Sequence, residues 1–177
     1  MPNINRTSGP EVPQAKTAPS EQAYQLPNGD KIFIEPGSVK KDGERLSMRL
    51  GRDQTTQGAN LPKGTIVTFK KSLLTEATLS KNHNVQGYNF SGGTRLEFDE
   101  DQKVTVAELA QPQKFRVQGQ KEPKLFKAGS ALFFNNQGQV KTVWLPEQSA
   151  KEGRQIINYY SDGTSKTTFM KKILGTA

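Results

Sequence analysis

Few residues of this chain have the types and spacing that chemistry requires. Among its 177 residues there is one histidine, His83, and no cysteine. A His-dependent triad, a thiolate nucleophile and a metal site of cysteines or paired histidines are therefore excluded. No glycine-rich phosphate loop precedes a helix pattern, and no Gly-x-Ser-x-Gly elbow occurs. His83 stands in a polar run from Lys81 to Asn84, which is typical of an exposed loop. We predict no catalytic residue, no metal ligand and no cofactor.

Acidic side chains gather once, in the run from Glu97 to Asp101. Calcium favours such oxygen ligands, but the alternating pattern and terminal glutamate of an EF-hand loop are absent. Glu97 and Glu108 could serve as general acid and base only if they faced each other across a cleft, whereas in a repeat sheet such residues usually form the solvated face. A carboxylate-dependent enzyme is thus the weakest of three functional alternatives, and we predict that the protein is not an enzyme.

Basic residues outnumber acidic ones, with a net charge of +8 and a pI near 9.7. Such a balance favours anionic partners. One group of basic residues surrounds Phe115 and Phe126 and consists of Lys114, Arg116, Lys121, Lys124 and Lys127. Interleaved bases and aromatic rings can bind single-stranded nucleic acid through phosphate contacts and stacking. The other interpretation, which we favour, places both phenylalanines in the core and leaves the lysines as solvated protection of a sheet edge.

Three aromatic residues near the C-terminal end are candidates for a binding surface. Trp144 is the only tryptophan, and it precedes Leu145. Two successive strand residues cannot both face a one-sided core. If Leu145 faces inward, Trp144 points outward and can act as a hot spot for a partner, together with Tyr159 and Tyr160. Burial of Trp144 under the following residues 146–153 is the alternative.

A glycine-based repeat organises the chain from Tyr24 onward. The aligned segments begin at Gly29, Gly64, Gly93, Gly129 and, in degenerate form, Gly163. Successive glycines lie 29 to 36 residues apart, which is a spacing typical of repeat architectures. Alternating apolar residues follow each glycine, and the third and fourth copies also share a phenylalanine, a valine and a leucine at equal spacing.

The apolar residues inside each copy alternate with a period of two, as in Leu96/Phe98 and Leu132/Phe134, which indicates strands. Turn residues between these runs make each copy a hairpin. A single hairpin cannot bury its apolar face, so the copies must pair or pack with one another. We predict an all-β fold of repeated antiparallel hairpins that form a meandering sheet, a barrel or a short β-solenoid. Residues 110–118 can add a third strand to a unit.

Two segments depart from the strand pattern. Residues 1–22 are rich in proline and polar residues, so we predict a flexible N-terminal arm before a single β-repeat domain of residues 23–177. Residues 146–153 are the one stretch able to form a turn or two of helix. Neither an apolar signal-peptide region nor a membrane span is visible, which predicts a cytoplasmic protein or one secreted without a cleaved signal peptide.

The order of glycine, small residue, alternating apolar positions, phenylalanine, turn, valine and leucine resembles the short β-hairpin repeats of bacterial proteins of the MORN style, over residues 24–145. The Tyr-x-Gly signature of MORN units is not kept. The resemblance implies a surface for binding. We expect a non-enzymatic binding or structural protein with a protein partner, either a bacterial secreted effector or cargo, or a component of a phage or secretion particle that forms an oligomer or assembly. The alternative is a basic nucleic-acid-binding module.

Overall fold

The computed structural model describes residues 21–146 and 153–170. These residues form 18 strands and no helix, and every pair of strands is antiparallel. The predicted all-β fold is therefore confirmed. Of the predicted arm, only Glu21 and Gln22 fall in this part, and Gln22 begins the first strand. The predicted helical turn after Pro146 lies outside the described residues.

Ten strands form one open, meandering sheet, which runs from β18 at one edge to β3 at the other without closing into a barrel. Consecutive strands form five long hairpins: β3–β4 (Lys40–Asp42, Arg45–Arg49), β7–β8 (Ile66–Lys70, Leu73–Thr78), β11–β12 (Arg95–Phe98, Val104–Glu108), β15–β16 (Ala131–Phe134, Val140–Trp144) and β17–β18 (Arg154–Tyr159, Ser165–Met170). No helix in the described part of the chain is long and apolar enough to cross a membrane.

The other strands form separate two-stranded hairpins, which we call the small hairpins. Four of them occur in the described residues: β1–β2 (Gln22–Gln25, Lys31–Ile34), β5–β6 (Gln54–Thr56, Ala59–Leu61), β9–β10 (His83–Val85, Tyr88–Phe90) and β13–β14 (Gln113–Phe115, Lys124–Phe126). Each is followed in the chain by a long hairpin, so a repeat unit has four strands rather than the predicted three.

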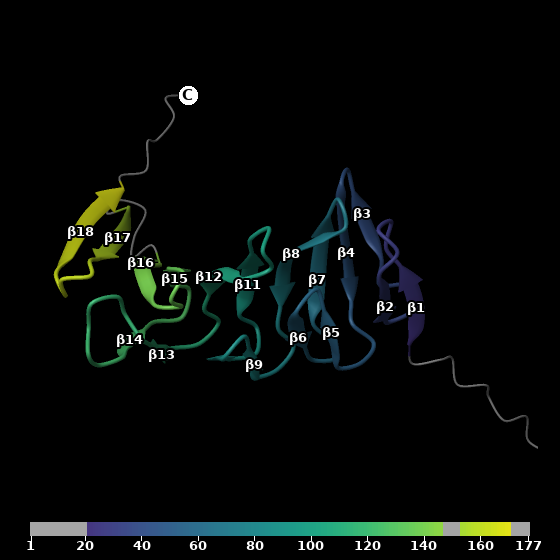
Figure 1. Ribbon diagram of the computed structural model, residues 1–177, viewed down its shortest axis with the longest axis horizontal. Helices are drawn as coiled ribbons and strands as arrows, with labels where there is room; N and C mark the ends of the chain where they lie inside the picture. The colour runs from purple at the N-terminus through teal and green to yellow at the C-terminus, as the bar shows by residue number, and fades with distance from the viewer. Residues whose placement is uncertain (1–20, 147–152, 171–177) are drawn as a thin grey trace, which may run out of the picture.

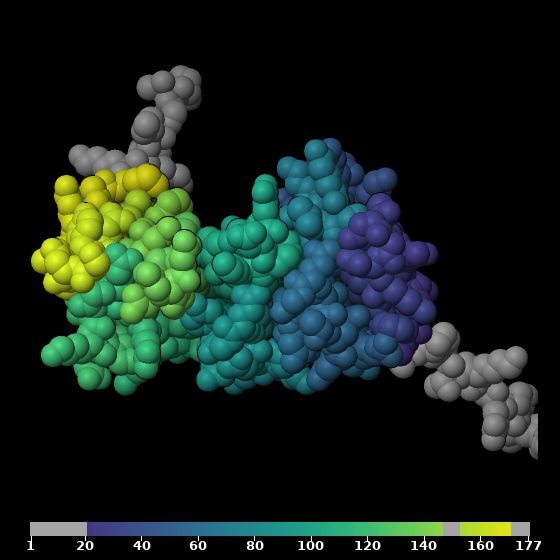
Figure 2. Space-filling view, viewed as in Figure 1, coloured from purple at the N-terminus to yellow at the C-terminus, as the bar shows by residue number. Residues whose placement is uncertain are grey.

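The units follow one another along the long axis of the molecule, from β1 at one end to β18 at the other (Figure 1). The colours of the space-filling view accordingly run in bands, with each unit beside its sequence neighbours (Figure 2). The small hairpins form a row that packs against one face of the ten-stranded sheet. Stability in such a molecule depends on each unit and its contacts with the next.

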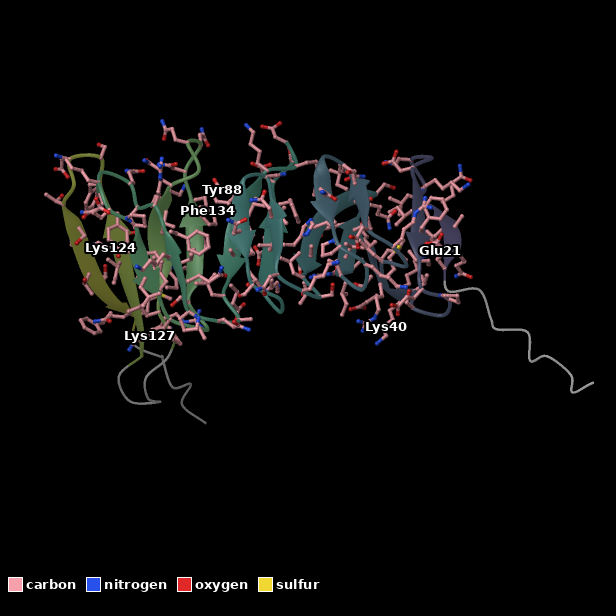
Figure 3. All side chains as sticks on the ribbon, turned by 90° about the horizontal axis from the view of Figure 1, so that it is seen from below. Glu21, Lys40, Tyr88, Lys124, Lys127 and Phe134 are labelled. Carbon is pink, nitrogen blue, oxygen red and sulfur yellow. The ribbon has the colours of Figure 1, made fainter. Side chains whose placement is uncertain are left out.

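The core lies between the sheet and the row. Because side chains alternate along a strand, one residue per strand faces the row at each level of the sheet. At the central level these residues pair in register and are at most 1% exposed: Met48, Val67, Ala77, Leu96, Ala107, Leu132 and Val143. Aromatic rings join the layers, with Tyr88 of the row 5.0 Å from Phe134 of the sheet (Figure 3).

The glycine alignment is correct for three copies and wrong at both ends. In the copies that begin at Gly64, Gly93 and Gly129, the glycine connects a small hairpin to its long hairpin. The backbone N of Gly64, for example, donates to Leu50 O at 2.8 Å. Gly29 and Gly163 instead lie at hairpin tips, where Gly29 N donates to Leu26 O at 2.9 Å. The true first copy has Gly37 at the connector. Connectors and tips both need a positive φ, so glycine alone does not distinguish them.

The tips of two small hairpins are fixed to the sheet by glutamines. Gln57 Oε1 accepts from the backbone N of Leu74 at 2.7 Å, and Gln86 Oε1 accepts from that of Val104 at 2.9 Å. Both glutamines have a positive φ and precede a glycine, which is the geometry of a tight hairpin turn. In these two units a single side-chain amide thus sets the position of the small hairpin on the sheet.

Candidate functional site

The two layers do not end together at the C-terminal end of the molecule. In the described residues the sheet has five long hairpins but the row has four small ones, so β17–β18 has no small hairpin of its own. A concave space of about 540 Å³ lies beside β14, β17 and the two residues that follow β16. We call it the terminal groove. It lies between residues 124–127 on one side and Leu145, Pro146, Ile157 and Tyr159 on the other.

Burial along the repeat indicates that the floor of the terminal groove is core left uncovered. The leucine that ends each of the first three units is at most 2% exposed, whereas Leu145, in the same position of the fourth unit, is only partly buried. Val143 is fully buried, but its partner on β17, Ile157, is partly exposed. Leu125 on β14 is 63% exposed. In earlier units the residues at the position of Leu125, Asn60 and Asn89, are exposed as well, so the loss of burial at this end concerns Leu145 and Ile157 and not Leu125.

The wall formed by β17–β18 is held by the long loop of β13–β14, residues 116–123. Val117 in this loop bridges Val140, and Gln118 N donates to Val140 O at 3.0 Å. Further along, Gln120 Nε2 donates to the carbonyl O of Gly163, at the tip of β17–β18, at 2.5 Å. The loop therefore ties the last long hairpin to the row.

Neighbouring small hairpins are joined by a side-chain amide. Gln54, the first residue of β5, donates from Nε2 to Phe33 O at 2.7 Å and accepts from Phe33 N at 3.1 Å. Gln113, the first residue of β13, donates to Asn89 O at 3.0 Å and accepts from Ser91 N at 3.0 Å. Phe33 and Asn89 hold the same position in their hairpins, one residue before the buried end residue. Both junctions therefore use a glutamine that donates to the carbonyl at this position, but the backbone N that it accepts from differs, being that of Phe33 at one junction and that of Ser91 at the other.

The corresponding groups of β14 face the terminal groove. Leu125 holds the position of Asn89, and Lys127 holds that of Ser91. Among the residues that the structure describes, no side chain donates to the carbonyl O of Leu125. The groove therefore combines an apolar floor with one backbone acceptor and one backbone donor at the places where a glutamine would bind.

His83 holds the glutamine position at the remaining junction. It is partly buried rather than exposed, and its Nε2 is buried without a hydrogen-bond partner in the described residues. Asn60, which corresponds to Phe33, borders the same cavity.

We expect His83→Gln to raise the free energy of unfolding by about 1 kcal/mol, because the amide can donate to Asn60 O. Urea unfolding measures this, with His83→Leu as the control that removes the unpaired nitrogen without supplying an amide. A His83→Gln variant no more stable than His83→Leu would show that a side-chain amide at this position does not join the two small hairpins.

The basic residues singled out in the sequence lie on and after β13–β14. Lys114, Arg116, Lys121 and Lys127 are exposed, while Lys124 is partly buried. Lys124 and Lys127 line the terminal groove, at the opposite end of the molecule from Glu21 and Lys40 (Figure 3). Phe115 and Phe126 are 6% and 4% exposed, so the prediction that they enter the core is confirmed. Neither ring is free to stack on a base.

Tyr159 and Tyr160 differ in exposure. Tyr159 is buried rather than exposed, at 6%, and its ring lines the groove with Lys124 Nζ 4.9 Å from its centroid. Burial raises the pKa of the Tyr159 hydroxyl, so this group stays neutral near pH 7. Tyr160 is 44% exposed and does not line the groove.

The sequence analysis did not identify Leu125 and Ile157 as residues of a site, because each is one apolar residue in an ordinary strand pattern.

Trp144 lies on the other face of the sheet from the groove. Its neighbour Val143 faces the row, so Trp144 points outward, where its ring lies 5.0 Å from that of Phe133. The guanidinium of Arg154 lies 5.8 Å from the tryptophan ring. The structure therefore does not bring Trp144 together with Tyr159 and the lysines.

Glu97 and Glu108 both bind one guanidinium. Arg95 lies 2.6 Å from Glu97, 3.4 Å from Glu108 and 3.2 Å from Glu76, and Arg45 also pairs with Glu76. The side chains are part of the solvated outer face, where such pairs contribute at most about 1 kcal/mol each. An acid–base pair across a cleft requires a different geometry. Among the described residues, no group of three acidic or histidine side chains could hold a metal ion.

Comparisons of this chain with models of protein families, with curated proteins and with solved structures gave no match. The resemblance to MORN-style repeats therefore stays a prediction from the sequence.

Proposed function

We propose that this protein is a non-enzymatic binding protein whose terminal groove receives an extended strand from a protein partner. The observation that carries the proposal is the interrupted row: within residues 21–146 and 153–170 the sheet continues to β18, while no small hairpin covers its apolar inner face beyond β14. Exposed apolar surface in a concave site is typical of a binding surface, and a volume of about 540 Å³ is within the usual range of ligand sites. A strand matches the groove because strands fill the same place in every earlier unit.

A polypeptide agrees with the site better than a nucleic acid does. The groove offers aliphatic side chains and backbone bonding groups, which an extended peptide can match. Single-stranded nucleic acid needs exposed aromatic faces, and both phenylalanines of the basic region are buried.

Peptides selected from a display library against the full chain test the proposal. We expect Leu125→Glu to weaken their binding by about tenfold or more, because a carboxylate would then stand on the apolar floor. Leu73→Glu is the matched control, since Leu73 is 43% exposed but lies on β8, outside the groove. Fluorescence anisotropy measures both affinities.

Equal losses in the two variants would contradict the proposal. Displacement of the peptides by a single-stranded oligonucleotide at about 50 mM salt would favour the nucleic-acid alternative instead, because phosphate contacts are strong at that ionic strength.

A further inference from the structure

We infer that the strand received by the terminal groove has a glutamine at its first position, an apolar residue at its third, and acidic residues around them. This inference rests on the proposed function and specifies its ligand. The template is the set of three internal junctions, in which one small hairpin docks beside the next.

The spacing comes from the first strands of the docked hairpins. Each has three residues: Gln54–Thr56, His83–Val85 and Gln113–Phe115. The third residue of each strand is buried, at 6%, 0% and 6% exposure, while the middle residue is exposed. Because side chains alternate along a strand, the first and third residues point to the same side. A ligand strand in the groove would therefore place its third side chain on the open floor beside Leu145 and Ile157.

The glutamine at the first position of the ligand strand is inferred from two backbone groups, one in β14 and one just after it. Leu125 O and Lys127 N hold the positions of Asn89 O and Ser91 N, which receive a donor and an acceptor from one glutamine at the preceding junction. A carboxamide supplies both at once, whereas a carboxylate has no donor and an ammonium group has no acceptor. Glutamine occupies this position at two of the three junctions, and at one of them Gln113 spans the same pair of backbone groups, so its chain length suits the distance.

The charge of the groove indicates which side chains should surround the first and third residues of the ligand strand. Of the described residues that line it, Lys124 and Lys127 are basic and none is acidic. Acidic side chains in the ligand would meet this charge, speed its association and make its binding sensitive to salt. The exposed middle position of the strand is the natural place for one of them.

A fluorescent peptide that copies residues 111–116, with Lys114→Glu and Arg116→Glu, is the probe. It keeps Gln113 and Phe115 of the internal strand and carries two acidic residues. We expect this acidic peptide to bind the full chain, and a version with Gln113→Glu to bind about tenfold more weakly, because the carboxylate faces Leu125 O without a proton to donate. The unchanged basic copy should bind more weakly than the acidic peptide, and the difference should shrink as salt is added. In the protein, Lys127→Glu should weaken the acidic peptide, and Leu73→Glu should leave it unaffected.

The outcomes distinguish a failure of this inference from a failure of the proposed function. If library peptides bind through Leu125 but the acidic peptide and its Gln113→Glu version bind equally, the glutamine rule is overturned and the groove remains a strand-binding site. If neither library peptides nor the acidic peptide respond to Leu125→Glu, both proposals fall. Self-association of the chain that Leu125→Glu abolishes, but that the acidic peptide does not displace, would overturn the inference in favour of a second copy as the occupant.

Discussion

Phe90→Ala is expected to lower the free energy of unfolding by about 3–5 kcal/mol, a large part of the total stability of a domain of this size. Phe90 ends the third small hairpin and is 1% exposed. Its ring lies 5.6 Å from that of Phe115 in the next small hairpin and 6.5 Å from that of Phe134 in the sheet. Truncation therefore removes contacts along the row and between the layers, and the rigid backbones on both sides cannot close the cavity.

Urea unfolding followed by circular dichroism measures this loss. Phe169→Ala is the matched control, because Phe169 is 63% exposed on the edge strand β18 and its truncation should change the stability by no more than about 0.5 kcal/mol. A loss below about 1 kcal/mol for Phe90→Ala would mean that the layers are not packed as described.

Gly119→Ala should loosen the wall of the terminal groove. Gly119 lies in the loop of residues 116–123 with a φ of +70°, a conformation that costs an L side chain about 1–2 kcal/mol. A Cβ at this position would also collide with the backbone of Tyr160 and Gly163, at the tip of β17–β18. Since backbone atoms cannot rotate away, the loop must move and its bonds to this tip must break. We expect a total loss of about 2–4 kcal/mol.

Hydrogen exchange locates the effect. Amides of β17 and β18 should exchange faster in Gly119→Ala, whereas those of β7 and β8 should change little, because units contact only their neighbours. Gly87→Ala separates the two causes: Gly87 has a φ of +88° but nothing within 4 Å of an added Cβ, so it carries only the backbone cost. Equal losses in the two variants would show that the loop does not hold β17–β18.

The sequence by itself determined the local structure of this protein. Period-two alternation, as in Leu96/Phe98, and residues able to take a positive φ specify strands and tight turns through interactions within a few residues. The absence of cysteine and of a second histidine removed whole classes of chemistry in the same way. Burial of Phe115 and Phe126 was also predictable, because each belongs to an apolar alternation next to a turn.

Only the tertiary structure decided how the hairpins are divided between two layers. Gly37 and Gly29 are both glycines in turns, and which of them is a connector depends on the layers of the strands that it joins: Gly29 joins β1 to β2 within one small hairpin, and Gly37 joins β2 to β3 of the sheet. The same is true of Gln54 and Gln113, whose role as junctions depends on backbone groups 21 or more residues away in the chain. In the part of the chain that the structure describes, the sheet continues one hairpin beyond the row, and the terminal groove lies where the two layers differ in length. Its floor has the same apolar pattern as the core, so Leu145 and Ile157 differ from buried residues only in what packs above them.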